Sequence, residues 1–255
     1  METNPNNQIN APVAAPGLLS FFDLLKESWK NYQKLFRGLI GLTALSLLAI
    51  APIFLAAGGS FLLVSVISSK AAAYILAGIL VVAAAVSAAY YGSAVQAGII
   101  CLLNNQTLSI KESFNQGRGL AVKYLVIMLL TGLLVLGWSL LFIIPGIIFS
   151  FYYGYGQFVL VAENQTGYAA LKRSKELVQG FWWPVAYRSM LLGLVLFAAL
   201  FVISIPLTVT PDGSAFNSLW NMLVQVIQLV VSPLVVCFSF AVYNNLVRIK
   251  DAAKG

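Results

Sequence analysis

Residues 121–162 read AVKYLVIMLLTGLLVLGWSLLFIIPGIIFSFYYGYGQFVLVA, an apolar stretch that is broken by Pro145-Gly146. A continuous helix of about 40 residues would extend about 60 Å, twice the roughly 30 Å hydrocarbon core of a bilayer. Proline cannot continue a hydrogen-bonded helix, and glycine readily adopts turn conformations. Pro145 and Gly146 therefore predict a tight hairpin turn between two membrane spans, residues 121–144 and 147–162. One long kinked helix is the alternative.

The rest of the chain has a similar composition. The 255 residues are 60% hydrophobic and only 9% charged, and the mean hydropathy is +0.88. A soluble protein of this size always leaves a large area facing water, so it could not bury so many apolar side chains. These values predict an all-α, polytopic membrane helical bundle with about six transmembrane helices in three hairpins. The hairpins are expected at about residues 38–103, 121–162 and 185–247. They lie within one membrane domain, 18–250, between a disordered N-terminal tail, 1–17, and a short C-terminal tail, 251–255.

The residue inventory argues against enzymatic chemistry. The chain has no histidine, which removes the commonest general base and the commonest neutral metal ligand. Cys101 and Cys237 stand far apart in or beside apolar segments, as packing residues do. None of the eight acidic residues falls in the middle of an apolar run, where intramembrane enzymes and proton-coupled carriers place ionisable groups. We therefore expect no catalytic residue, no metal site and no cofactor.

The net charge of +7 indicates how the chain is oriented. Its basic residues are dispersed between the apolar segments, which favours orientation in a membrane over nucleic-acid binding. With both ends inside, Lys70 is the only one of the 15 Lys and Arg residues that lies outside. This predicts a multi-pass protein of the inner (plasma) membrane with cytoplasmic N- and C-termini. Trp29, Trp182 and Trp183 then fall at the inner interface, as amphipathic rings prefer.

A short charged motif precedes each predicted hairpin. It reads LKESW at residues 25–29, IKESF at 110–114 and LKRSK at 171–175. These copies predict a unit of one amphipathic interfacial helix plus one hairpin, used three times. The alternative is that positively charged loops resemble one another by composition alone. In the first copy one apolar helical stripe is formed by Phe22, Leu25, Trp29, Tyr32 and Phe36. Interfacial lipid contact with the anionic inner leaflet is expected from Lys26, Lys30, Lys34 and the tryptophans.

The last predicted span carries polar side chains on one helical face. They are Asn217, Asn221, Gln225, Gln228 and Ser232. Because a lipid-facing amide is costly, this face is expected to contact protein or water. It is therefore either an inter-helix hydrogen-bonding face or the lining of a polar conduit.

The second predicted span presents small residues at steps of four. These residues are Ala85, Ala89, Ser93 and Ala97, with Gly92 and Gln96 nearby. Small side chains at that spacing permit close approach of two helices. The pattern therefore predicts a packing seam.

Residues 144–182 contain a recognisable motif. An Ile-Pro-Gly turn is followed by a span that ends in Glu163, and then by an Ala-Leu-x-x-Ser-x-x-Leu-x-x-Gly helix that leads to Trp182. This pattern resembles a broad group of bacterial and archaeal integral membrane proteins, which includes the membrane domain of some glycerophosphoryl diester phosphodiesterases. The resemblance implies six helices and no established chemistry, because catalysis in the fused proteins resides in a separate soluble domain. We do not expect that domain in this chain.

Together, these observations favour a non-enzymatic integral membrane protein. It would act as a membrane scaffold, or as a bundle that accommodates a lipid or small molecule. A transporter or channel component that uses the polar face of the last span is the alternative. The expected partners are membrane lipids and the anionic inner leaflet, with no nucleic acid; a protein partner or a homo-oligomer is left open.

Overall fold

The computed structural model describes residues 17–67, 69–210 and 214–253, and in these residues it contains helices and no strand. Six helical stretches among them are long and apolar enough to cross a membrane, so the predicted all-α, multi-pass architecture is confirmed. The predicted N-terminal tail, apart from Gly17, lies outside the described residues, as does Asp212. The helices are α1 (Phe21–Leu48), α2 (Ala51–Val66), α3 (Lys70–Asn104), α4 (Ile110–Leu141), α5 (Ile143–Tyr153), α6 (Gly156–Glu163), α7 (Gly167–Val178), α8 (Trp182–Val209) and α9 (Ala215–Ala252).

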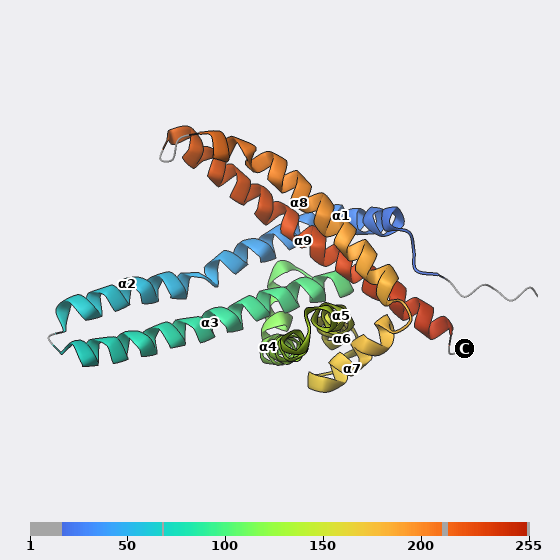
Figure 1. The fold of residues 1–255 in the computed structure, drawn as a ribbon, viewed down its shortest axis with the longest axis horizontal. Helices are drawn as coiled ribbons and strands as arrows, with labels where there is room; N and C mark the ends of the chain where they lie inside the picture. Colours follow the sequence, from blue (N-terminus) through green and yellow to red (C-terminus); the bar gives the residue numbers. More distant parts are fainter. Residues whose placement is uncertain (1–16, 68, 211–213, 254–255) are drawn as a thin grey trace, which may run out of the picture.

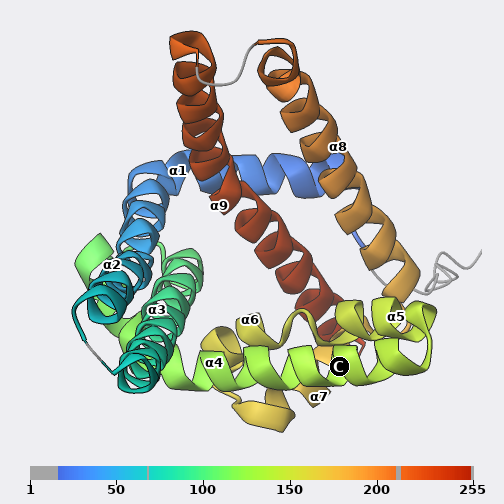
Figure 2. The same cartoon turned by 60° about the vertical axis from the view of Figure 1, so that its left-hand side comes forward.

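Three helical hairpins extend from a common base. The pairs α2–α3, α4–α5 and α8–α9 project from it in different directions (Figures 1 and 2). The buried core lies at the base, where the ends of several helices meet, and it includes Leu39, Ile99, Ile127, Phe158, Leu171 and Tyr243. Beyond the base the helices are poorly covered by protein. In α8, for example, the side chains that the structure shows buried are Val185, Ala186 and Leu192, near its basal end.

The three motif copies pack on the three hairpins in a cyclic order, which supports the predicted threefold repeat. Each copy of the charged motif packs on the hairpin of another copy: α4 begins against α3, α7 packs on α4, α5 and α6, and α1 packs on α9. The serines at the same position of the three motifs, Ser28, Ser113 and Ser174, are all fully buried. Shared burial of a polar side chain at one motif position is more than similarity of composition requires.

A separate helix before the hairpin, as expected for each copy, is found only in the third copy. α1 runs without a break from the first charged motif into the first apolar run, and α4 does the same in the second copy. In the third copy Gly180 has a φ of 89°, a left-handed conformation that glycine adopts at low cost, and it separates α7 from α8. The first apolar run is instead interrupted at Ala49 and Ile50, just before Pro52 in the first turn of α2.

The turn of the central hairpin lies earlier than predicted. α4 ends at Leu141 and α5 begins at Ile143, so the extended residue between them is Phe142. Pro145 and Gly146 lie in the first turn of α5, where a proline's missing N–H removes no helical hydrogen bond. A Cβ on Gly146 would lie 2.0 Å from Ser139 Oγ. Gly146 therefore permits the close approach of α4 and α5.

Two further boundaries differ from the sequence prediction. The apolar segment 147–162 is not one helix, because α5 ends at Tyr153 and α6 begins at Gly156. The start of the expected C-terminal tail, 251–255, was predicted too early, since α9 continues through Ala252. Residues 254–255 lie outside the described part of the chain.

Candidate functional site

A groove with a volume of about 950 Å³ opens between α3, α4 and α6. This is within the range of pockets that hold small molecules, roughly 300–1,000 Å³. On α3 its wall includes Ala85, Ala89 and Gly92, whose small size leaves the space open. The facing wall is formed by α4, with Leu125 and Leu129 among its residues.

The groove is apolar at its outer end and polar toward the base. α3 runs inward to the base and α4 runs outward from it, so Ala85 and Leu129 mark the outer end. Ser93 and Gln96 of α3 line the inner end, together with Tyr124 of α4 and Gln157 of α6. The Tyr124 hydroxyl donates a hydrogen bond to Gln157 Oε1. The Gln96 side chain is exposed to the groove and is free to meet a polar ligand group.

The small residues of α3 do not form the packing seam that was predicted for them. Ala85 and Ala89 are exposed in the groove, and of that stripe only Ala97 is buried. The close contact between α3 and α4 lies on a neighbouring face of α3, where Ala94 and Gly98 meet the first part of α4. A Cβ on Gly117 of α4 would lie 2.1 Å from the Ala94 carbonyl oxygen and 2.6 Å from Gly98 N. The groove lies farther out along the two helices than this glycine contact.

A basic rim continues the α4 wall of the groove toward the base. Lys111 and Arg118 precede Leu125 by fourteen and seven residues, about four and two helical turns, so all three share one face of α4. Both cations are exposed, and neither forms an ion pair or a hydrogen bond with any residue that the structure describes. The arrangement matches an amphipathic molecule with an apolar tail and a polar, negatively charged end.

No protein family, curated protein or solved structure matches the chain. The resemblance to the membrane domain of glycerophosphoryl diester phosphodiesterases therefore stays a prediction.

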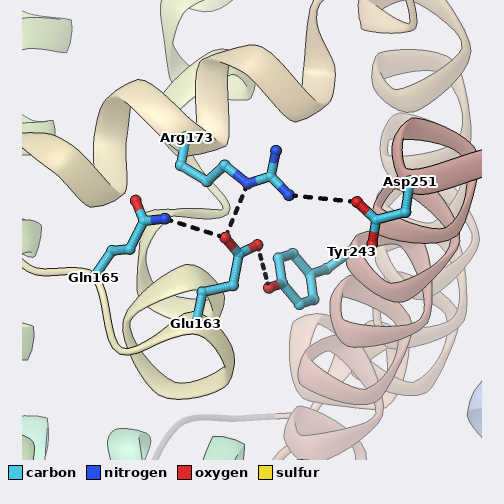
Figure 3. Close-up of polar contacts among 5 residues, drawn as sticks. All are labelled: Glu163, Gln165, Arg173, Tyr243 and Asp251. Carbon is cyan, nitrogen blue, oxygen red and sulfur yellow. Dashed lines mark hydrogen bonds and ion pairs between the residues drawn. The ribbon is translucent and has the colours of Figure 1, made fainter. Parts of the chain in front are cut away.

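A polar cluster ties α6, α7 and α9 together at the base (Figure 3). Glu163, at the end of α6, accepts hydrogen bonds from Arg173 Nε of α7 at 2.9 Å and from the Tyr243 hydroxyl of α9 at 3.0 Å. Gln165 Nε2 donates a longer bond, 3.3 Å, to the same carboxylate. Asp251 Oδ1 lies 4.0 Å from Arg173 Nη2. Sequence reasoning missed this cluster; its only signal was an acidic residue at the end of an apolar run.

The contacts of the cluster hold three helices together. Each oxygen of the Glu163 carboxylate already has a donor, and Arg173 bridges two carboxylates. In the part of the chain that the structure describes, no three Cys, Asp or Glu side chains gather as metal ligands would.

The polar residues of the last predicted span lie on α9, and most of them are exposed. Asn217 is half-buried and donates a hydrogen bond to Thr210 Oγ1 at 3.1 Å, beside the α8–α9 turn. Asn221, Gln225, Gln228 and Ser232 are exposed. The hydrogen bonds of Gln225 and Ser232 stay within α9, to Asn221 Oδ1 at 3.4 Å and to the Leu229 carbonyl at 3.0 Å. Within one chain, Asn217 is the member of this face that the described residues show bonded to another helix.

The helix that carries the first charged motif, α1, presents three faces rather than one apolar and one charged face. Its buried face is formed by Leu24, Ser28, Tyr32, Leu35 and Leu39, and the Tyr32 hydroxyl donates to the Val230 carbonyl of α9 at 2.7 Å. The predicted apolar stripe is displaced from this face, because Phe22, Trp29 and Phe36 are exposed. Lys26, Lys30 and Lys34 are exposed on a third face, where Lys34 Nζ donates to Gln106 Oε1 at 2.6 Å.

The tryptophans that begin α8 lie at the base. Trp182 is half-buried, and its indole N–H donates to the Ile148 carbonyl at 3.3 Å, whereas Trp183 is exposed. One and a half turns later, Arg188 folds back instead of extending to the surface. Its guanidinium donates to the carbonyls of Leu18 and Leu19 at 3.1 and 2.8 Å, which fixes the segment that enters α1.

Proposed function

We propose that this chain is a non-enzymatic membrane protein that binds an anionic membrane lipid in the groove between α3, α4 and α6. The observation that supports this most directly is the order of chemistry along the groove. Apolar side chains line its outer end, Ser93, Gln96 and Gln157 its inner end, and exposed cations follow on α4. A phospholipid has the same order: acyl chains, polar ester linkages and a charged headgroup.

The orientation that this proposal requires follows from the position of the charges. We propose that the base faces the cytoplasm of a cell with an anionic inner leaflet, so that both termini are cytoplasmic. Among the cationic residues that the structure describes, Lys70 stands apart at the tip of the α2–α3 hairpin. Basic residues beside membrane spans are retained on the cytoplasmic side, where anionic lipids attract them.

Filling the groove should release the lipid. Ala89→Trp places a large side chain in the groove wall, and the overlap should lower lipid occupancy about tenfold, because displacing well-packed groups costs about 1–3 kcal/mol. The measurement is native mass spectrometry of protein that was extracted with its own lipids. Ala83→Trp is the matched control, since Ala83 is an exposed alanine of the same helix that does not line the groove.

Equal lipid retention by Ala89→Trp and Ala83→Trp would refute the groove as the binding site. Arg118→Glu tests the charged end separately. It should lower the retained fraction of anionic lipids while leaving that of zwitterionic lipids unchanged. Loss of all lipids together would show that the rim does not select charge.

The proposed orientation has a direct labelling test. Cysteines introduced beside Asp212 and after Lys254 should react with a membrane-impermeant reagent from opposite sides of the membrane. In sealed cells only the site near Asp212 should react, and permeabilised cells should label both. Labelling of both sites in sealed cells would contradict cytoplasmic termini.

A further inference from the structure

Four polar side chains form a stripe on α9 in the middle of a membrane span. We define the polar stripe as Asn221, Gln225, Gln228 and Ser232, which lie on one exposed face of the helix. Trp220 Nε1 donates to the Ile203 carbonyl of α8 at 2.9 Å, so the stripe begins level with the outer part of α8. It extends inward over about 16 Å, half the thickness of the hydrocarbon core.

The hydrogen bonds of the stripe are poorly met within one chain. Gln225 reaches only Asn221 in its own helix, at 3.4 Å. Ser232 is bonded to the Leu229 carbonyl, which lost its normal helical partner because Pro233 has no N–H. Amide groups that face acyl chains have no water to complete their hydrogen bonds, which is costly. The stripe therefore needs a polar partner from outside the chain.

We propose that the partner is a second copy of this chain, which pairs α9 against α9 along the polar stripe. Each amide carries both a donor and an acceptor, so the stripe is complementary to itself. Both copies have the same orientation in the membrane, so a two-fold axis along the membrane normal runs the two α9 helices in parallel. Each Asn or Gln then meets its own counterpart at the same depth. The side chains of the stripe are exposed, and the α8–α9 hairpin projects away from the other two hairpins (Figure 2).

The proposal is tested by measuring self-association of the full chain in liposomes. Fluorescence energy transfer between labelled copies should report a dimer at low protein density. The double variant Gln225→Leu with Gln228→Leu should weaken the dimer at least about tenfold, since each interhelical amide contact contributes about 1 kcal/mol in a membrane. The control, Met222→Leu with Val226→Leu, changes exposed residues off the stripe and should associate like the wild type. A monomeric wild type, or a leucine double variant that still dimerises fully, would overturn the proposal.

Disulfide cross-linking locates the interface independently. The native Cys101 and Cys237 are buried, so the unaltered chain should not cross-link. Ser232→Cys should form an intermolecular disulfide, and adding Gln225→Leu and Gln228→Leu should abolish it. Val226→Cys, about 100° around the helix from Gln225, should not cross-link. Cross-linking at Val226 without cross-linking at Ser232 would overturn the proposal, as would pairing with a different membrane protein through the stripe.

Discussion

Gly117→Ala is expected to lower the free energy of unfolding by about 3 kcal/mol, although it adds a single methyl group. The new Cβ would lie 2.1 Å from the Ala94 carbonyl oxygen and 2.9 Å from Gly98 Cα, which are backbone atoms of α3. A flexible side chain could move aside, but this backbone can yield only if α3 and α4 separate. Unfolding in mixed detergent micelles, followed by circular dichroism, measures the change.

Gly119→Ala is the matched control for this substitution. Gly119 lies two residues later in α4, and a Cβ there meets no atom within 4 Å. Alanine has a higher helix propensity, so this variant should be as stable as the wild type or more stable by up to about 1 kcal/mol. Equal destabilisation by both variants would show that the contact of Gly117 with α3 does not decide the result.

Glu163→Ala is expected to have the next largest effect, a loss of about 2–3 kcal/mol of stability. The substitution removes the acceptor of both the Arg173 guanidinium and the Tyr243 hydroxyl, and it leaves a largely buried cation with only a distant partner. Because Glu163 joins α6 to α7 and α9, the loss should also loosen the base as a unit. Amide hydrogen exchange should rise in all three helices, which a purely local effect would not produce.

Asp251→Ala provides the comparison within the same cluster. Its carboxylate is mostly exposed and lies 4.0 Å from Arg173 Nη2. Exposed ion pairs of this kind contribute about 0–1 kcal/mol, so this variant should stay close to the wild type. A larger loss of stability from Asp251→Ala than from Glu163→Ala would contradict the assignment of Glu163 as the main carboxylate partner of Arg173.

The sequence was sufficient to predict the spans and the hairpins, because both follow from local composition and length. The predictions were wrong where one local sequence pattern is compatible with two different structures. Pro145 and Gly146 do accompany a hairpin turn, but proline is equally suited to the first turn of a helix, and the turn lies at Phe142. Similarly, a charged motif can form a separate helix or continue into the span that follows it, and the first two motifs continue into their spans.

The groove and the polar cluster could not be predicted from one sequence for a different reason. Small residues such as Ala89 pack closely if the neighbouring helix stays near, and they line a cavity if it diverges. The contact of Gly117 with Ala94 and Gly98 decides between these outcomes, and it depends on two segments that are separate in sequence. The partners of Glu163 likewise come from two other helices, one of them eighty positions away.

The packing of α1 on α9 has a consequence for biosynthesis. α1 is the first described helix to leave the ribosome and α9 is the last, yet Tyr32 bonds to Val230, 198 positions later. Until then the face of α1 that packs on α9 lacks its partner. The other two packing contacts at the base, α4 on α3 and α7 on α4, α5 and α6, can form as soon as neighbouring segments are made. The newborn chain must therefore hold α1 without this partner until α9 has been synthesised.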